Sequence, residues 1–552
     1  MSGVRVLLLY PRFAQDSFWR NLELARLKGA RCMAPPLGLI TVAALLPAHW
    51  EARLCDLNAR ALDPADLEWA DVVFVSGMLP QRQEALAAVA AMQGAGKVVV
   101  VGGPDVSSSP EAYAAADFRV LGEAEATLSA FVEVWESGAR SGLITTPEER
   151  PAVTQTPVPR FDLLHLPDYL FVGVQFSRGC PFTCEFCDII ELYGRVPRTK
   201  TAAQMLAELD ALYALGYRGH VDFVDDNLIG NKKAVKAFLP HLIEWQRAHG
   251  HPFHFSTEAS LNLADDPALL DQMAEAGFYL VFVGIESPDP EVLRSTQKKQ
   301  NTKRDIAASV HRIYAAGIVV IAGFIVGFDN ESPDAADAMA ELIEEAAIPV
   351  VSLGLLYALP DTQLSRRLER EGRMFPLKEE DFRHGDQTGA GLNFATLEPR
   401  IDVLRRYREV YARVYAPRAF FGRIRRLSDL VGRKHGAGQE GAVAAIEQPA
   451  LPAPIDVRQM VADLGRLFGV LATVTWRHPR AAVHIWPVAL RGLKRLDRLE
   501  QLLSLALFYM HLGPFSRKVV RDVSRQIAEI EAGRWVDPRE AAPAHSPLRA
   551  AE

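Results

Sequence analysis

The chain has 552 residues, of which 49% are hydrophobic and 23% are charged, with a net charge of −7. This length exceeds what one hydrophobic core usually spans, so we expect two or three packed globular domains. The small net charge gives no basic field that would attract nucleic acid, so we exclude nucleic acid as a partner.

The five cysteines are an odd number in a long chain and do not fit a secreted disulfide framework. They favour a reducing environment, and we predict a cytoplasmic location. The apolar run at residues 4–11 is too short for a signal peptide. No stretch reaches the roughly 18 apolar residues that a spanning helix needs, so we expect no transmembrane segment.

The first part of the chain alternates short β-branched runs with alanine-rich stretches. The runs are Val4–Tyr10, Glu51–Asp56, Asp71–Ser76, Lys97–Gly102 and Phe118–Leu121. This pattern predicts βαβ units and an α/β, Rossmann-like domain over residues 1–140. Several runs end in glycine or polar residues, where a ligand would meet the carboxyl ends of the strands; simple tight turns are the alternative. Residues 141–168, rich in proline and threonine, are predicted to be a linker.

A second alternation fills residues 169–395. The strand candidates are Phe171–Phe176, His220–Val224, Phe253–Thr257, Leu280–Gly284, Val319–Val326 and Val350–Leu355, each followed by a plausible helix. Six βα units predict a partial (β/α)6 barrel, whose chemistry would lie at the carboxyl ends of its strands.

The rest of the chain predicts a helical domain over residues 396–535, with a flexible interruption near 432–454 and a disordered tail at 536–552. Its basic residues Arg423, Arg425 and Arg426 stand beside Phe420 and Phe421. One interpretation is a basic amphipathic surface that contacts the inner face of a membrane. The other is a solvated helix face with the phenylalanines packed inward.

The most specific motif is a Cys-x3-Cys-x2-Cys loop, Cys180, Cys184 and Cys187, directly after the first barrel strand. Soft thiolates match iron, and one loop can wrap three corners of an iron–sulfur cube, leaving the fourth iron open to a small molecule. The alternatives are a zinc site with a distant fourth ligand, or three unrelated thiols. Cys32 and Cys55 fall in a different predicted domain.

This loop, with its aromatic Phe186 before the last cysteine, resembles the cysteine loop of the radical S-adenosylmethionine (SAM) superfamily. The resemblance implies a [4Fe–4S] cluster that, once reduced, cleaves SAM to methionine and a 5′-deoxyadenosyl radical. It also implies an external electron donor of the flavodoxin or ferredoxin type. The SAM contacts that it implies are Phe186, Asp225, Asp226, Asn227, Glu258, Glu286, Ser287, Gly327 and Tyr357.

Residues 4–530 as a whole resemble the cobalamin-binding branch of that superfamily, and in particular the group that contains the hopanoid C-2 methylase. The segments that carry this likeness are 33–38, 70–78 and 187–195. It implies an N-terminal cobalamin-binding domain with contacts at Pro36, Ser76, Gly77, Met78, Gly102, Gly103, Gly122 and Glu123. One departure is that the Asp-x-His-x-x-Gly motif of histidine-ligated cobalamin proteins is absent. We therefore predict no histidine ligand below the cobalt, because His49, the single histidine before the linker, lacks the flanking residues.

The resemblance implies a cobalamin-dependent methyltransferase that acts on an unactivated carbon of a lipid or secondary metabolite. A second SAM would re-methylate the cobalamin. The alternatives are a non-methylating cyclisation or rearrangement, and a non-catalytic iron–sulfur electron carrier. The open iron corner and the SAM-like strand ends argue against the electron carrier.

Overall fold

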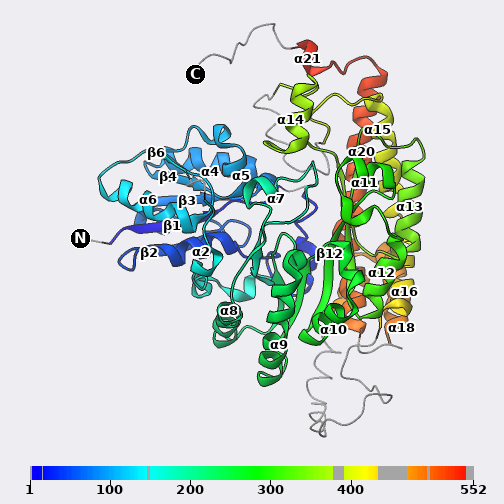
Figure 1. The fold of residues 1–552 in the computed structure, drawn as a ribbon, viewed down its shortest axis with the longest axis horizontal. Helices are drawn as coiled ribbons and strands as arrows, with labels where there is room; N and C mark the ends of the chain where they lie inside the picture. Colours follow the sequence, from blue (N-terminus) through cyan, green and yellow to red (C-terminus); the bar gives the residue numbers. More distant parts are fainter. Residues whose placement is uncertain are drawn as a thin grey trace.

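The computed structural model describes residues 3–14, 17–145, 149–376, 391–432, 469–493 and 498–541. An N-terminal α/β domain, a barrel-like domain and a set of C-terminal helices lie side by side, with the barrel between the other two (Figure 1). This confirms the predicted fold class. The predicted interruption beyond residue 432 and the tail beyond residue 541 lie outside the described residues. Within the described ranges, no helix is long and apolar enough to cross a membrane.

The N-terminal domain is built on a six-stranded parallel sheet in the order β2-β1-β3-β4-β5-β6. Its strands are β1 (Arg5–Tyr10), β2 (Glu51–Asp56), β3 (Val72–Ser76), β4 (Val98–Gly102), β5 (Phe118–Val120) and β6 (Gly142–Ile144). All five predicted strands are confirmed. The predicted linker starts too early, because β6 occupies residues 142–144. Its three residues carry too little β-branched pattern to be recognised, and its pairing with β5 makes it a strand.

Alternating side chains along these strands cover both faces of the sheet, as a doubly wound fold requires. Val6 and Leu8 face one core together with α2 (Leu37–Leu45) and α6 (Ala124–Glu136). Leu7 and Leu9 face a second core with α3 (Pro64–Trp69) and α4 (Arg82–Gly94). The winding reverses between β1 and β3, so a crevice opens at the carboxyl ends of these strands.

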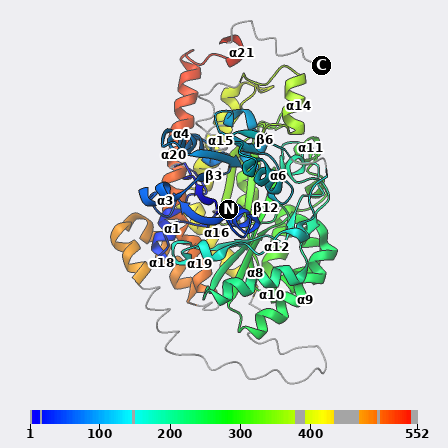
Figure 2. The ribbon, with the colours of Figure 1, turned by 90° about the vertical axis from the view of Figure 1, so that its left-hand side faces the viewer.

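The barrel domain is an open, parallel, six-stranded sheet in the order β14-β13-β12-β11-β10-β7. Its strands are β7 (Val172–Val174), β10 (Gly219–Phe223), β11 (Phe253–Glu258), β12 (Phe278–Glu286), β13 (Val319–Val326) and β14 (Val351–Leu355). Each predicted barrel strand is confirmed. The helices that follow the strands are α8 (Ala202–Ala214), α9 (Lys232–Ala248), α10 (Pro267–Ala276), α12 (Ile306–Ala315), α13 (Ala335–Glu345) and α14 (Gln363–Arg370). Figure 2, turned by 90°, shows the N-terminal domain in front of this sheet.

The C-terminal helices cover the edge at which the barrel sheet ends. They are α15 (Arg400–Val414), α16 (Pro417–Leu430), α18 (Pro479–Gly492), α19 (Leu499–Leu507), α20 (Tyr509–Glu531) and the short α21 (Pro538–Ala541). The hydroxyls of Tyr407 and Tyr411 on α15 both donate to the Leu353 carbonyl of β14, at 3.1 and 3.0 Å. An uncovered edge strand exposes unpaired backbone groups, and these hydroxyls satisfy one of them.

The structure contradicts a membrane-binding surface at Phe420 and Phe421. Both side chains are fully buried. Arg423 is buried as well, and it donates to the Ile348 carbonyl at 2.7 Å and to the Val414 carbonyl at 2.7 Å. Arg423 and Arg426 also pair with Glu344. These contacts of Arg423 and Arg426 join α16 to α13. The sequence could not distinguish the two interpretations, because a basic helix that packs on a neighbouring helix has the same composition as one that binds lipid.

Candidate active site

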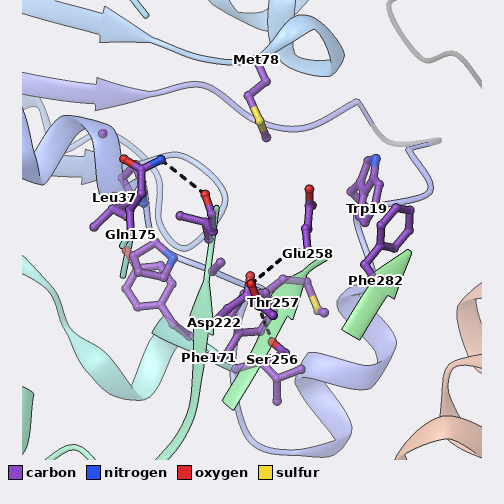
Figure 3. Close-up of a pocket in the computed structure, with 18 of the residues that line it drawn as sticks. Trp19, Leu37, Met78, Phe171, Gln175, Asp222, Ser256, Thr257, Glu258 and Phe282 are labelled. Atoms are coloured by element: carbon purple, nitrogen blue, oxygen red, sulfur yellow. Dashed lines mark hydrogen bonds between the residues drawn. The ribbon is translucent and has the colours of Figure 1, made fainter. Parts of the chain in front are cut away.

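A cavity of about 2200 Å³ lies between the carboxyl ends of the N-terminal sheet and the interior of the barrel. Ordinary small-molecule pockets measure about 300–1,000 Å³, so this one has room for more than one ligand. Trp19, Met78 and Val224 are large apolar side chains with exposed surface, and all three border the cavity. Figure 3 shows Met78 entering it from the N-terminal domain, opposite Glu258 of β11.

The cysteine loop follows β7 and the short β8 (Ser177–Arg178), and backbone hydrogen bonds fold it back on itself. The Cys187 amide donates to the Cys184 carbonyl at 3.2 Å, and the Cys180 amide donates to the Gly194 carbonyl at 3.2 Å. Gly179 has a φ of 95°, and a Cβ there would lie 2.8 Å from the Gly194 carbonyl oxygen. A residue with a side chain would therefore not fit this turn.

The three thiols lie close enough for Cys180 to affect the ionisation of Cys184 and for both of these to affect that of Cys187. Burial raises the pKa of Cys180, Cys184 and Cys187, and neighbouring thiols raise the pKa of Cys184 and Cys187 further. Holding all three as thiolates therefore requires a cationic partner, which an iron–sulfur cluster provides. No group of three potential ligands around one ion occurs in the described part of the chain. A cubane does not need one, because each thiolate binds a different iron atom.

The acidic residues after β10 hold the cysteine loop in place. Asp225 accepts hydrogen bonds from the backbone of Phe176, at 3.1 Å, and from the backbone and hydroxyl of Ser177. Asp226 accepts from the Gly179 amide at 2.7 Å and borders the cavity. Asn227 lies 3.8 Å from the Cys180 sulfur and donates to Ser260 at 3.1 Å. Their predicted contact with SAM stays a prediction, and the role visible in the structure is to fix the loop that carries the cysteines.

Two glutamates predicted to contact SAM border the cavity. Glu258 ends β11 with its side chain exposed to the cavity, and desolvation by the surrounding walls together with Asp222, Asp226 and Asp225 raises its pKa to about 8. Glu286 ends β12 with a φ of 71° and accepts a 2.7 Å hydrogen bond from Lys298. Lys298 also lowers the pKa of Cys184, so it links the predicted SAM contact to the predicted cluster site.

The other predicted SAM contacts surround this region. Phe186 packs against Phe328, with ring centroids 5.6 Å apart, and Lys298 lies 6.0 Å from its ring. Ser287 is buried and accepts from the Asp289 amide at 3.1 Å. Gly327 has a φ of 111°, and Tyr357 lies two residues past β14, near enough to Arg82 to add to the rise in pKa that Asp105 causes there.

The predicted cobalamin contacts come together at the opposite side of the cavity. All eight border it: Pro36, Ser76, Gly77, Met78, Gly102, Gly103, Gly122 and Glu123. Gly103 has a φ of 97°, and a Cβ there would lie 2.4 Å from the Ser76 hydroxyl. The Met78 loop is pinned by Gln81, which accepts from the Met78 amide at 3.0 Å. Room and backbone access for a planar cofactor are both present, and the residues fit the group that the resemblance implies.

Sequence reasoning missed the ionic clamp that joins the two halves of the site. Arg178, two residues before Cys180, donates to Glu123 at 2.8 Å and to Glu125 at 2.8 and 2.9 Å. Arg198 donates to Glu123 at 2.7 and 3.1 Å. The Glu123 carboxylate is thus engaged with two arginines while the residue borders the cavity. Burial opposes ionisation of Glu125, but hydrogen bonds from Arg178 lower its pKa to about 2. The sequence feature that could have indicated this clamp is the position of Arg178, two residues before the first cysteine of the Cys-x3-Cys-x2-Cys loop.

The chain matches known families in the order of its domains. It matches the B12 binding domain over residues 30–132 and the Radical SAM superfamily over residues 174–343. Residues 362–525 match a domain of unknown function, DUF4070. Fold and site together define a radical SAM enzyme with a B12-binding domain.

Curated relatives place the chain more closely. It is 47% identical over 422 residues to an uncharacterized methyltransferase from Synechocystis, covering 76% of this chain and 78% of the relative. It is 35% identical over 523 residues to the hopanoid C-2 methylase from Rhodopseudomonas palustris, covering 94% of each. The chain belongs to the family of cobalamin-dependent radical SAM methyltransferases, and its cofactors are a [4Fe–4S] cluster, SAM and cobalamin.

Solved structures support the fold. The radical SAM methyltransferase TsrM from Kitasatospora setae, with cobalamin and a [4Fe–4S] cluster bound, has a TM-score of 0.53 at 17% identity and covers 67% of this chain and 78% of its own. The cobalamin-dependent SAM radical enzyme OxsB with aqua-cobalamin bound has a TM-score of 0.58 at 14% identity and covers 97% and 82%. The second alignment extends the shared fold over nearly the whole chain.

Proposed function

We propose that the protein methylates an unactivated carbon of a lipid-like substrate or a secondary metabolite bound in the cavity. One observation carries this proposal: the loops expected to hold cobalamin border the same cavity as Asp226, Glu258 and Glu286, three of the barrel residues expected to hold SAM. Methyl transfer needs the donor and the acceptor carbon side by side, and a shared chamber allows this. Similarity to a hopanoid C-2 methylase favours a lipid-like substrate.

Each part of the chain has a defined task in this proposal. When bound, the cluster and SAM supply a hydrogen-abstracting radical, and cobalamin supplies the methyl group. Cys180, Cys184 and Cys187 hold the cluster, and an external flavodoxin- or ferredoxin-type protein supplies electrons. Glu258 and Glu286 accept hydrogen bonds from the ammonium group or ribose hydroxyls of SAM.

The chain also fixes the distance between the two cofactor regions. Gly102, Gly103 and Gly122 would let the backbone approach cobalamin, and Met78 would contact it from the loop after β3. Arg178 ties the start of the cysteine loop to Glu123 and Glu125 at the start of α6. Both glutamates are almost fully buried, so the clamp keeps its geometry better than a surface pair does.

Product analysis tests the proposed function. The anaerobic holoenzyme is supplied with reductant, SAM carrying a deuterated methyl group, and a lipid extract from a strain that lacks the gene. We expect S-adenosylhomocysteine and 5′-deoxyadenosine to form together, and a product that carries the deuterated methyl group. Cys184→Ala is the control that should form neither. 5′-Deoxyadenosine without S-adenosylhomocysteine would indicate a rearrangement, and an intact cluster that forms neither would indicate an electron carrier.

A further inference from the structure

One part of the cavity lies inside the barrel, on the far side of Glu258 from Met78. It is lined by polar side chains of three adjacent barrel strands. His220 and Asp222 come from β10, His254 and Ser256 from β11, and Tyr279 from β12. His220 is the register partner of His254, and Asp222 that of Ser256. Glu258 stands four residues along β11 from His254, which corresponds to about 13 Å. We call these five residues the inner polar cluster.

The inner polar cluster is a chain of hydrogen bonds whose direction can be worked out. The Ser256 hydroxyl donates to Asp222, and the His220 Nε2 lies 2.6 Å from the same hydroxyl oxygen. Because a serine has one hydroxyl hydrogen, His220 must donate through Nε2. Its Nδ1 is then an acceptor for the Tyr279 hydroxyl, at 3.4 Å. Burial lowers the pKa of His220 well below its ordinary value, which agrees with a neutral ring.

This chain of hydrogen bonds leaves two acceptor oxygens that face the cavity. In the described residues no hydrogen bond occupies the second carboxylate oxygen of Asp222, and the Tyr279 oxygen has accepting capacity left once its hydrogen is given to His220. Buried polar groups are costly without partners, so a ligand that fills this part of the cavity should bring a hydrogen-bond donor. Figure 3 shows Asp222 and Ser256 on the barrel side of the cavity, below Glu258.

The walls next to the cluster are apolar and come from both ends of the chain. Trp19 packs against Phe282 of β12, with ring centroids 6.1 Å apart. From the C-terminal helices, Leu505, Phe508 and Leu512 border the same cavity. Gln501 of α19 donates to the Tyr279 carbonyl at 3.0 Å, which fastens this helix against β12. The domain of unknown function thus forms one wall of the chamber.

The charges around the cluster disfavour an ionic ligand. Asp222 is acidic, and Lys28, which is paired with Glu500 at 3.1 Å, contributes positive charge near His220. Two arginines also border the cavity: Arg498 donates to the carbonyls of Gly317 and Gly432, and Arg218 donates to the carbonyls of Tyr213 and Tyr217. An anionic end group would face Asp222, and a cationic one would face Lys28.

We propose that the inner polar cluster binds an uncharged hydroxyl-type end group of the substrate, whose apolar skeleton extends past Trp19 and Phe282 toward Met78. Asp222 and the Tyr279 oxygen share the single hydroxyl hydrogen as the two acceptors of a bifurcated hydrogen bond, and His220 and Ser256 hold these acceptors in position. The apolar wall formed by Leu505, Phe508 and Leu512 disfavours a substrate with a polar skeleton. This inference rests on the proposed function, because it names the class of molecule that the same chamber methylates.

The test is the binding of three probes that share one ring skeleton: cholestanol, its hydrocarbon cholestane, and cholestanol sulfate. Each is delivered in cyclodextrin to the anaerobic holoenzyme without SAM, and its Kd is measured by equilibrium dialysis. We expect cholestanol to bind about three- to tenfold more tightly than the other two, the range of one net hydrogen bond. Ser256→Ala and Tyr279→Phe should each reduce this preference to below about twofold. His220→Phe should reduce the preference in the same way, and His241→Phe, on the exposed face of α9, is its matched control.

Three results would overturn the inference: no binding of any ring probe, equal or tighter binding of the sulfate, or an alcohol preference that survives in both Ser256→Ala and His220→Phe. Iron content and the cobalamin spectrum confirm that each variant is folded and loaded. Because the assay involves no turnover, its failure leaves methyl transfer untouched. Conversely, a holoenzyme that binds cholestanol selectively but never forms S-adenosylhomocysteine with any extract refutes the proposed function alone.

Discussion

The two parallel sheets of this enzyme present their ligand-binding ends in opposite ways. The N-terminal sheet ends in Gly77, Gly102, Gly103 and Gly122, so its strand ends offer mostly backbone to the cavity. The barrel sheet ends in reactive and charged side chains, such as Cys180, Asp226, Glu258 and Glu286. Both sheets have six parallel strands, and the difference between them lies in the residues at the carboxyl ends of those strands.

This contrast matches the chemistry that each sheet has to support. A large, preformed macrocycle needs a surface that lets it approach closely, and glycine provides that. A cluster and SAM need ligands and hydrogen-bond acceptors, and only side chains supply those. Substitutions at the strand ends of the barrel should therefore abolish activity because they remove ligands of the cluster or of SAM. Substitutions at the glycines of the N-terminal sheet should instead weaken cobalamin binding because they add a side chain where the backbone must approach the cofactor.

The largest effect is expected at the cysteine loop. Cys184→Ala should lower iron from about four atoms per chain to near zero and abolish SAM cleavage, because one corner of the cube loses its ligand. Iron and sulfide analysis after anaerobic reconstitution measures this. Cys55→Ala, a buried cysteine of the other sheet, is the control. If Cys55→Ala emptied the site while Cys184→Ala did not, the ligand assignment would be wrong.

A next, smaller effect should result from bulk at Gly103. Its backbone, at φ 97° and ψ −174°, lies in a region that is almost exclusive to glycine. Gly103→Ala should cost about 1–3 kcal/mol of stability and weaken cobalamin binding at the same time. Gly138, with φ 96° and no atom near its missing Cβ, is the matched control, and Gly138→Ala should keep cobalamin. Equal cobalamin loss in both variants would mean that general strain, not close approach, is responsible.

The third effect should appear in SAM affinity and its dependence on pH. The pKa of Glu258 is raised to about 8, so its carboxyl is neutral at pH 7 and becomes anionic above pH 8. SAM is cationic, so its affinity for the unmodified enzyme should rise as pH increases through 8, and Glu258→Gln should lack the rise. At pH 9 the variant should bind about ten- to hundredfold more weakly, the effect of one charge-assisted hydrogen bond.

Two further variants complete this test. Glu286→Gln removes the other predicted SAM carboxylate, and Glu275→Gln alters an exposed glutamate as the control. If SAM affinity is unchanged in both Glu258→Gln and Glu286→Gln, neither carboxylate binds SAM. The effect of pH on stability has the opposite sign. Because the folded state holds the Glu258 proton more tightly than the unfolded chain, stability of the apoprotein should fall between about pH 4.5 and pH 8, and less so in Glu258→Gln.

Much of this contrast could be predicted from the sequence, because strands and strand ends are local features. The eleven predicted strands and the cysteine loop depend on β-branched runs and spacing that neighbouring residues determine. The Arg178 clamp and the Lys298–Glu286 pair could not be predicted, since each joins residues that only the tertiary fold brings together. The burial of Phe420 and Phe421 likewise depends on which helix packs beside them.

A moderate effect on stability is expected at the clamp between Arg178 and the glutamates Glu123 and Glu125, which joins the two sheets. Glu125→Gln leaves Arg178 paired with Glu123 but replaces one accepting oxygen by an amide nitrogen, so Arg178 loses one hydrogen bond and the other loses its charge. Stability measured by denaturant unfolding should fall by about 1–3 kcal/mol, because the weakened pair is charged and buried. Asp162→Asn breaks an exposed pair with Arg160 and should cost about 0–1 kcal/mol. A Glu125→Gln effect no larger than that of Asp162→Asn would show that the clamp adds little.

The smallest effect should come from the one histidine of the N-terminal domain. His49 lies between α2 and β2, with its side chain 52% exposed and its Nε2 3.5 Å from Glu136, and it does not border the cavity. A ligand to cobalt would have to enter the cavity, where Met78 stands instead. His49→Ala should therefore leave both the absorption spectrum and the electron paramagnetic resonance spectrum of the cobalamin-loaded enzyme unchanged. Superhyperfine splitting from a coordinating nitrogen that disappears in His49→Ala would contradict this, and would require the β2 side of the sheet to rearrange when cobalamin binds.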